Sequence, residues 1–137
     1  MAAYPEMLHT VIDTTDPRRL AEFYRQLLGY SYREGDEPRA SGDADDDDWM
    51  VLVDSNGMRK LAFQRVDELT RTTWPSAEVP MQLHVDFTVP DTDELERHRA
   101  RAEELGATML FDRTDDPDEP LYVVADPAGH PFCLFVG

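Results

Sequence analysis

The feature of this sequence that most constrains its fold is an internal repeat. The stretch from His9 to Asp16 aligns with the stretch from His84 to Asp91, and each is followed by a helical pattern that ends in Leu-Gly. A recurring pattern of this kind means that one supersecondary unit is used more than once. The sequence therefore predicts two similar modules in a chain whose 137 residues are the size of one ordinary domain.

The first module has clear start and stop signals. A strand is predicted over residues 8–14, where β-branched side chains are frequent. A helix follows, because Asp16 supplies an N-cap oxygen, Pro17 suits the first helical position and Gly29 suits the end. The apolar stripe of this helix has helical spacing and consists of Leu20, Phe23, Tyr24, Leu27 and Leu28. Three further strands are predicted at residues 30–33, 49–54 and 60–66.

The second module repeats this order after a connector over residues 67–80, which shows no periodicity. Its elements are expected at residues 82–89 (strand), 92–106 (helix), and 108–111, 121–125 and 132–136 (strands). One helix covers only one face of a sheet, so the modules need a shared core. We therefore predict an α+β fold in which two βαβββ modules form curved sheets around a cavity. We expect one domain over residues 1–137, with module 1 at about 5–66 and module 2 at about 81–137.

The strand predicted at residues 82–89 indicates which side of a sheet is wet. Its odd positions are apolar and its even positions are polar, a clean period of two. The apolar side is expected to pack on the helix, and the polar side carries His84 and Asp86. We interpret this polar side as the wall of a cavity that is open to solvent. The alternative is an ordinary solvated face.

Composition excludes several classes of function. The chain has 13 basic and 29 acidic residues, a net charge of -16, which repels phosphate backbones and anionic lipid headgroups. We therefore expect no nucleic-acid partner and no membrane partner. No apolar run approaches the roughly 18 residues of a membrane span, and the N-terminus lacks the pattern of a signal peptide, so we expect a cytoplasmic protein. Because Cys133 is the single cysteine, no intrachain disulfide can form, and a homodimer is expected to add stability.

Several motifs resemble a known family. They are residues 8–12 (LHTVI), 83–86 (LHVD) and 126–132 (DPAGHPF). Together they resemble the vicinal oxygen chelate superfamily, which includes glyoxalase I, extradiol dioxygenases, fosfomycin-resistance enzymes and bleomycin-binding proteins. Residues 61–66 (LAFQRV) and 73–75 (TWP) look most like its glyoxalase-like domain branch. The match covers nearly the whole chain, and such motifs specify a fold far better than a reaction.

The resemblance implies a candidate metal site. In metal-dependent members each module contributes one ligand from its first strand and one from its last. Carried over by position, these sites are His9, Gln64, His84 and Cys133. Family enzymes usually have carboxylates at the last-strand sites, and this sequence departs from that pattern at both. Imidazole, amide and thiolate donors favour Zn²⁺ over hard ions. The missing carboxylates disfavour extradiol cleavage and the glyoxalase I reaction, which needs a carboxylate base.

The same residues have plainer interpretations. Cys133 lies between apolar neighbours, where a free cysteine commonly behaves as a small hydrophobe. His9 and His84 can hydrogen-bond without holding a metal, and Gln64 can orient a ligand through its amide. Asp86 lies two residues after His84 and so on the same face of a strand. It is a candidate general acid or base if it is buried beside an imidazole, and otherwise a solvated carboxylate.

Aromatic side chains indicate the chemistry of the ligand. Those expected near a cavity mouth are Trp49, Trp74, Tyr122 and Phe135. Flat apolar walls suit an aromatic or planar organic molecule, whereas core packing or a dimer contact is the alternative for each residue. We therefore predict a small-molecule-binding protein that holds a planar or aromatic organic ligand. The alternatives are a zinc-dependent lyase, isomerase or transferase, and a module whose role is assembly.

Overall fold

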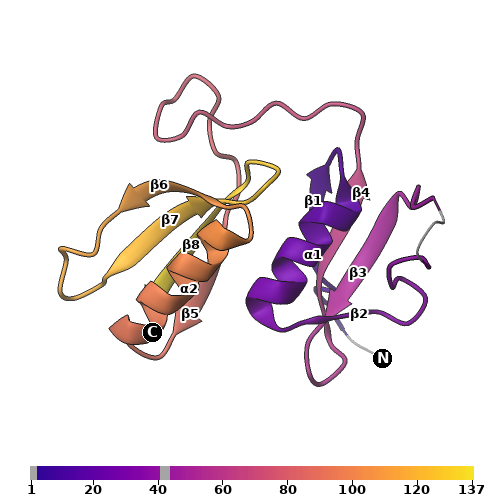
Figure 1. Cartoon of the computed structure of the whole chain (residues 1–137), viewed down its shortest axis with the longest axis horizontal. Coiled ribbons are helices and arrows are strands. Elements are labelled where there is room, and N and C mark those ends of the chain that lie inside the picture. Colours follow the sequence, from indigo (N-terminus) through magenta and orange to yellow (C-terminus); the bar gives the residue numbers. More distant parts are fainter. Residues whose placement is uncertain (1–2, 41–43) are drawn as a thin grey trace. The chain divides into compact units, whose positions relative to one another are not determined.

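Both halves of the chain fold into the same order of elements. The computed structural model describes residues 3–40 and 44–137. Unit 1 contains β1 (Thr10–Thr14), α1 (Pro17–Leu28), β2 (Ser31–Tyr32), β3 (Trp49–Val53) and β4 (Arg59–Arg65). Unit 2 contains β5 (Val85–Val89), α2 (Thr92–Glu104), β6 (Thr108–Asp112), β7 (Leu121–Ala125) and β8 (Pro131–Val136). The predicted α+β class and the two βαβββ modules are confirmed (Figure 1).

The division between the units falls inside the predicted connector. Contacts within the chain separate unit 1, Met1–Leu69, from unit 2, Thr70–Gly137. Residues 67–80 contain no helix and no strand, as expected. In the part of the chain that the structure describes, no helix has the length and apolar character that crossing a membrane requires.

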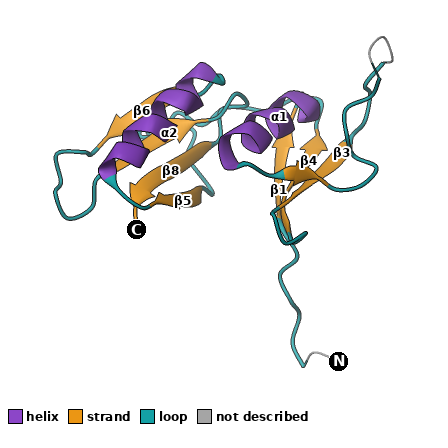
Figure 2. Cartoon of the chain, turned by 60° about the horizontal axis from the view of Figure 1, so that its bottom comes forward, coloured by secondary structure: helices purple, strands orange, loops and turns teal. Residues whose placement is uncertain are grey.

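Each unit contains one four-stranded sheet with the same connectivity. The strand order is β1-β4-β3-β2 in unit 1 and β5-β8-β7-β6 in unit 2. In both sheets the first strand pairs in parallel with the last strand, which also pairs antiparallel with the strand before it. The helix of each unit lies across one face of its own sheet (Figures 1 and 2). We call the opposite face of each sheet its open face.

Helix α1 is held by a large apolar surface. Its first turn is capped by Asp16, whose carboxylate accepts a hydrogen bond from the backbone N–H of Arg19 at 3.2 Å. Gly29 ends it with a left-handed φ of 72°, which favours glycine. The buried residues are Pro17, Leu20, Ala21, Phe23, Tyr24 and Leu27. Tyr24 stacks on Phe63 of β4, with 5.9 Å between the ring centroids, so α1 is anchored on the centre of its sheet.

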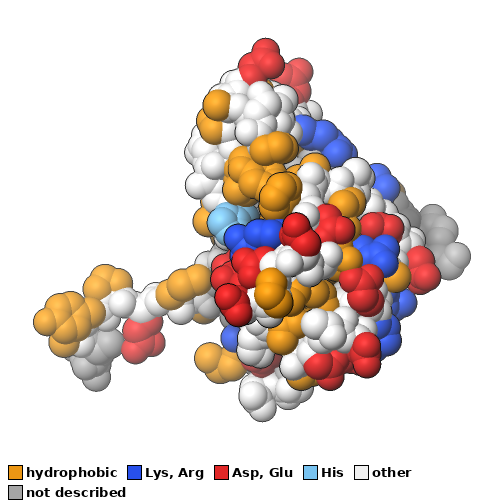
Figure 3. Space-filling view, turned by 90° about the vertical axis from the view of Figure 1, so that its left-hand side faces the viewer, with side chains coloured by type: hydrophobic (Ala, Val, Ile, Leu, Met, Phe, Trp, Pro, Cys, Tyr) orange, Lys and Arg blue, Asp and Glu red, His pale blue; other side chains and the backbone are white. Residues whose placement is uncertain are grey.

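Helix α2 has a much smaller apolar stripe. Its buried residues are Leu95 and Ala102, and Asp91 caps its first turn. Ion pairs between successive turns supplement this packing, such as the one between Arg99 and Glu96 at 2.9 Å. The face of the molecule in Figure 3 shows acidic and basic side chains interspersed in this way among exposed hydrophobic ones.

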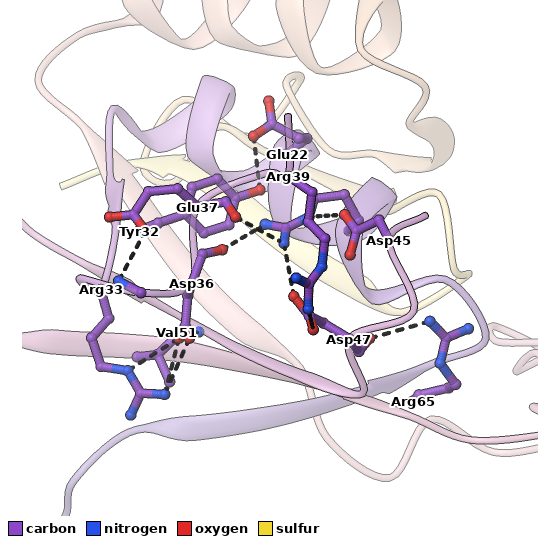
Figure 4. Close-up of polar contacts among 12 residues, drawn as sticks. Glu22, Tyr32, Arg33, Asp36, Glu37, Arg39, Asp45, Asp47, Val51 and Arg65 are labelled. Atoms are coloured by element: carbon purple, nitrogen blue, oxygen red, sulfur yellow. Dashed lines mark hydrogen bonds and ion pairs between the residues drawn. The ribbon is translucent and has the colours of Figure 1, made fainter. Parts of the chain in front are cut away.

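Residues 33–40 and 44–48, between β2 and β3, contact α1 and one another through arginine side chains. Arg18 of α1 donates hydrogen bonds to the Asp45 carboxylate at 2.5 Å and to the backbone oxygen of Asp36 at 2.7 Å. Arg39 pairs with Asp47 at 2.6 Å (Figure 4). These contacts fix an acidic segment that would otherwise repel itself, and they lead the chain into β3 beside the open face of unit 1.

Three predicted strands are shorter than expected: β1 begins at Thr10 and not at residue 8, β2 covers only Ser31–Tyr32, and β5 differs most. The strand predicted from residue 82 begins at Val85, and Leu83 is 66% exposed instead of packing on the helix. The pairing of β5 with β8 starts at Val85 and Phe132. The residue before Phe132 is Pro131, which has no N–H to donate, so the ladder cannot extend further back. His84 therefore lies just before the strand and not within it.

Candidate functional site

The register of unit 2 places a row of side chains across its open face. Asp86 pairs with Cys133, Cys133 with Val123, and Val123 with Phe111. Directly paired residues point to the same side of a sheet, so these side chains share one face. The alternate residues of β8, Phe132 and its i+2 neighbour, are almost fully buried on the α2 side. The row therefore lies on the open face, as the alternation in the sequence predicted for Asp86.

His84, Asp86 and Cys133 bring three kinds of donor atom together. The His84 Nε2 atom is 3.3 Å from a carboxylate oxygen of Asp86. One donor atom from each of the three residues lies within 4.8 Å of the others. In the described ranges 3–40 and 44–137, no other three His, Cys, Asp or Glu side chains meet this condition. The structure thus adds Asp86 to two of the predicted ligands.

The thiol of Cys133 is protonated at neutral pH. Burial raises its pKa to about 11, and the charge of Asp86 and a hydrogen bond to that carboxylate act in the same direction. A thiol of this kind is a poor nucleophile, and a metal that binds it must displace the proton.

The three residues fit a zinc ion by the chemistry of their donors. Imidazole nitrogen, carboxylate oxygen and thiolate sulfur are the ligands that zinc takes in proteins, and three protein ligands leave a fourth position open. Hard ions such as Mg²⁺ prefer oxygen-only sites.

Aromatic side chains border the same row. Phe111 of β6 is 45% exposed, and its ring contacts that of Trp74 edge to face, with 6.2 Å between the centroids. Phe135 pairs with Thr88 and therefore lies on the open face as well. The predicted residues Trp74 and Phe135 are thus associated with this face. Phe111 was missed, because nothing in the sequence distinguishes an exposed aromatic residue in a short strand from a buried one.

Tyr122 does not lie where the sequence analysis placed it. It is only 6% exposed, and its hydroxyl donates a hydrogen bond to Glu96 of α2. Its pKa is raised, mainly by burial and also by that hydrogen bond. Tyr122 pairs with Leu134, which is itself 2% exposed, so both side chains point toward the helix. Tyr122 is a core residue of unit 2 and not part of the open face.

The open face of unit 1 carries a separate hollow. Trp49 pairs with Gln64, and Gln64 pairs with Asp13, whose carboxylate accepts a hydrogen bond from the Gln64 amide at 3.3 Å. The hollow has a volume of about 530 Å³ and is lined by Asp48, Trp49, Gln64, Arg65, Val66 and Asp67. Two of the predicted ligand-binding residues, Trp49 and Gln64, therefore border one open space.

His9 lies beside the same tryptophan. The centroids of the His9 and Trp49 rings are 5.8 Å apart. The Nδ1 atom of His9 is buried and has no hydrogen-bond partner among the residues that the structure describes. Burial lowers the pKa of His9, and the charges of Arg59 and Arg33 lower it further, so the imidazole is neutral at pH 7. A neutral imidazole can accept a proton or a hydrogen bond from a ligand.

The register also shows that Gln64 and Cys133 are not equivalent positions. In unit 2 Cys133 pairs with Asp86, two residues after His84. In unit 1 the residue two positions after His9 pairs with Ala62, which has no donor atom. Gln64 lies two residues further along β4. His9 and Gln64 belong to unit 1, and His84 and Cys133 belong to unit 2, so a joint site of all four residues stays a prediction.

Comparisons with known proteins agree with the fold. The model of the glyoxalase-like domain family matches residues 9–135. No curated protein matches the sequence significantly. A glyoxalase/bleomycin resistance protein/dioxygenase family enzyme from Burkholderia phytofirmans PsJN has a TM-score of 0.68 and 17% identity over 94% of this chain and 96% of that chain. A possible glyoxalase from Bacillus cereus has a TM-score of 0.62 and 17% identity, with 94% and 96% covered.

A third solved structure includes ligands. It is a variant of the fosfomycin resistance protein FosX from Listeria monocytogenes, complexed with Mn(II) and 1S,2S-dihydroxypropylphosphonic acid. Its TM-score is 0.67 at 17% identity, with 100% of this chain and 94% of that chain covered. At such identities the similarity shows the fold alone. The family match and these neighbours confirm the resemblance that the motifs indicated.

Proposed function

Because the chain belongs to the glyoxalase-like domain family of the vicinal oxygen chelate superfamily, we propose that it is a small-molecule-binding protein. A planar organic ligand lies against the open face of unit 2, where its flat surface contacts Phe111 and its polar atoms reach His84 and Asp86. The observation that carries this proposal is the exposed Phe111 ring, supported by Trp74, on the same face as three polar donor groups. Sites for small molecules commonly combine apolar walls with a few convergent polar groups.

The state of Cys133 supports binding without covalent chemistry. Its pKa of about 11 keeps the thiol protonated at neutral pH, so it contacts a ligand as a weak hydrogen-bond donor and a small apolar surface. Asp86 has a partner on each side, the imidazole of His84 and this thiol. Such a set suits the orientation of a polar ligand group by hydrogen bonds.

Calorimetric titration with a panel of aromatic compounds tests the proposal. We expect Phe111→Ala to weaken binding at least tenfold, a loss of about 1.4 kcal/mol, because the ring that buries the ligand is removed. Met58→Ala is the matched control, since Met58 is 61% exposed on the hairpin of unit 1. The ligand should be recovered unchanged. A converted ligand, or equal binding by the two variants, would contradict the proposal.

A second candidate function is a metal-dependent lyase, isomerase or transferase. The specific observation in its favour is the group of His84, Asp86 and Cys133, with donor atoms within 4.8 Å of one another. FosX of Listeria monocytogenes, a structural neighbour, is complexed with Mn(II). A zinc ion held by these residues would supply Lewis-acid polarisation of a substrate oxygen. The residues themselves would bind and orient the ion.

The metal content of protein purified without added metal separates the two functions. The second candidate predicts close to one zinc per chain, and loss of that zinc in both His84→Ala and Cys133→Ala. His98→Ala is the control, because His98 pairs with Glu94 on α2, away from the open face. Absence of stoichiometric zinc in the unmodified protein would exclude the metal-dependent candidate and leave the binding function.

The homodimer expected from the sequence is also a proposal. An extended segment precedes β1 (Figure 2), and it exposes Tyr4, Met7 and Leu8 at 82%, 83% and 59%. Apolar side chains exposed together on one segment are typical of a contact surface. Sedimentation equilibrium is the test: we expect a dimer for the full chain and a weaker dimer when Tyr4 and Met7 are replaced by serine. A monomer at all concentrations would contradict it.

A further inference from the structure

Arg113 is a basic residue on the open face of unit 2 whose hydrogen bonding is incomplete. It follows β6, and its backbone N–H donates to the oxygen of Leu121 at 2.9 Å. Leu121 pairs with Phe135. The alternation of side chains therefore places Arg113, Leu121 and Phe135 on one face, in the row next to Cys133. Sequence reasoning missed this residue because it lies in an acidic loop without periodicity.

Two features of the Arg113 side chain point to a missing partner. Its Nε atom is buried and has no hydrogen-bond partner among the residues that the structure describes. Its Nη2 atom is 3.3 Å from a carboxylate oxygen of Glu119, in an ion pair whose two side chains are 39% and 56% exposed. A guanidinium presents its N–H groups as a planar fork that suits a bidentate oxyanion. In Arg113, the Nη2 atom makes an ion pair between exposed side chains, and the adjacent Nε atom makes no hydrogen bond with the described residues.

Arg99 provides an internal comparison, because its Nε is also buried without a partner. The guanidinium of Arg99, however, binds two carboxylates of its own helix, Glu96 at 2.9 Å and Glu103 at 3.4 Å. It also lies over the ring of Tyr122, on the α2 side of the sheet. The partners of Arg99 thus lie on the α2 side of the sheet, whereas Arg113 has one exposed partner and lies on the open face.

The register places Arg113 in the row next to Cys133 on the same face of the sheet, and their charges interact accordingly. The charge of Arg113 lowers the pKa of the Cys133 thiol, and the charge of Glu119 raises it. Both side chains therefore lie near enough to the thiol to affect it. Arg113 follows Phe111 by two residues at the β6 edge of the sheet, so its ion pair with Glu119 lies next to the Phe111 ring on the open face.

We propose that Arg113 is the anion receptor of this site, and that the ligand is a planar organic anion whose carboxylate replaces Glu119 on the guanidinium. The inference rests on the proposed binding function and adds the charge of the ligand. Glu119 holds the arginine in place while no ligand is bound. The exchange of one carboxylate for another costs little, because the ion pair that breaks is exposed. The net charge of -16 makes such a local receptor necessary for an anion.

Binding of matched aryl carboxylates and aryl carboxamides tests this inference. The probes are benzoate, 2-naphthoate and their neutral amides, titrated at low ionic strength. We expect Arg113→Gln to weaken carboxylate binding at least tenfold and to leave amide binding within twofold. Arg113→Lys should lose most of the same affinity, because lysine keeps the charge but lacks the fork. Glu119→Gln should strengthen carboxylate binding severalfold by removing the competing carboxylate.

The controls separate failure of this inference from failure of the proposed function. Arg97→Gln removes an exposed arginine that pairs with Glu94 on α2, and should change neither affinity. Equal losses in Arg113→Gln and Arg97→Gln, or equal losses of carboxylate and amide, would overturn the role of Arg113 while leaving the binding function intact. Failure of both probe classes to bind the unmodified protein would overturn the binding function and this inference together.

Discussion

Unit 1 places Val11 beside Ala62 at the centre of its open face, whereas unit 2 places Asp86 beside Cys133 at the equivalent positions. The strand order and the register around these pairs are the same in both units. Unit 2 therefore has two side chains with donor atoms at positions where unit 1 has two apolar side chains. A repeated backbone does not imply a repeated site, and the chemistry of each unit has to be inferred from its own residues.

The next row across the sheet shows the opposite difference. Asp13 pairs with Gln64 in unit 1, and Thr88 pairs with Phe135 in unit 2. Among the residue pairs between the first and last strands, the pair in which both side chains carry donor atoms thus lies in the outer row in unit 1 and in the central row in unit 2. In unit 1 the hollow beside Trp49 lies at this outer row. The two open faces therefore present different side chains, and each has to be considered as a binding surface of its own unit.

The helices differ as well, although both begin at an aspartate cap. Helix α1 buries Leu20 among aromatic neighbours, while the equivalent Leu95 in α2 has only Ala102 as a buried companion on its helix. Both leucines are 1% exposed. Unit 1 should therefore depend on packing, and α2 should depend more on ion pairs along its surface.

The largest expected effect tests the difference between the two helices at their buried leucines. Replacing a buried leucine by alanine lowers the free energy of unfolding by about 2–5 kcal/mol. Leu20→Ala should fall in the upper half of this range, because the rigid aromatic surroundings of Leu20 cannot close the cavity. Leu95→Ala should fall in the lower half of that range. Urea denaturation measures both, with Met58→Ala as an exposed control. A loss from Leu95→Ala that equals or exceeds that from Leu20→Ala would contradict the difference.

The second effect concerns the matched hairpin turns. Gly57 and Gly129 both have positive φ, 78° and 97°. A Cβ at Gly57 would meet nothing within 4 Å, whereas one at Gly129 would lie 2.7 Å from Cγ of Arg71. Both alanine variants should lose about 1–2 kcal/mol from backbone strain, and Gly129→Ala should lose about 1–3 kcal/mol more from overlap. Arg71 also holds this turn, since its guanidinium donates a hydrogen bond to the backbone oxygen of Pro127 at 2.6 Å.

The same denaturation experiment checks the turns with a double variant. Arg71→Ala together with Gly129→Ala should recover part of the loss, because the overlapping side chain is gone. The corresponding pairing of Arg71→Ala with Gly57→Ala should be additive, since the two residues are in separate units. Additivity in both pairs would show that Arg71 does not limit the turn.

Local signals in the sequence were enough to predict the order of elements. The caps of the first helix, Asp16 and Gly29, and the alternation from Val85 to Val89 act through nearby residues, and the structure contains them as predicted. The repeat then extended these local signals to the second module. The boundary at Val85 was the main error, because it depends on Pro131, far away along the chain.

The candidate site was harder to predict, because it depends on pairing across strands. Tyr122 lies in a strand whose residues are nearly all buried, so alternation does not reveal which face it occupies. Ala62 and Cys133 are equivalent only through the register, which the motifs do not determine. Arg113 lies in a loop, and its position near Cys133 follows from the way that β6 and β7 pair.

The third prediction concerns the thiol of Cys133, which lies in the central row of unit 2 where unit 1 has Ala62. Burial and Asp86 raise its pKa to about 11, from an ordinary value of 9.0. The folded state therefore retains a proton that the unfolded state loses, so this contribution to stability is present below pH 9 and declines as the pH rises toward 11. Asp86→Asn should lower the thiol pKa and raise the rate of alkylation at pH 8 severalfold.

Iodoacetamide labelling of chelator-treated protein, followed by mass spectrometry, measures this rate between pH 7 and pH 9. Asp93→Asn is the control, because Asp93 lies in the first turn of α2, on the other side of the sheet of unit 2 from the thiol, and should not affect it. An unchanged rate in Asp86→Asn would mean that burial alone sets the pKa of Cys133, and that Asp86 does not contribute to it.

The smallest expected effect distinguishes the two helices by their response to salt. The ion pair of Arg99 with Glu96 on α2 should contribute about 0.2–0.5 kcal/mol, and salt screens it. Raising sodium chloride from 0.05 to 1 M should therefore speed hydrogen exchange of the α2 amides by about twofold relative to those of α1. Sodium sulfate at matched ionic strength is the control for general effects of salt on burial, because it strengthens apolar packing in both helices. If exchange accelerates equally in both helices, the ion pairs of α2 do not compensate for its small apolar stripe, and the buried side chains of Leu95 and Ala102 and the Tyr122–Glu96 hydrogen bond must hold the helix on its sheet.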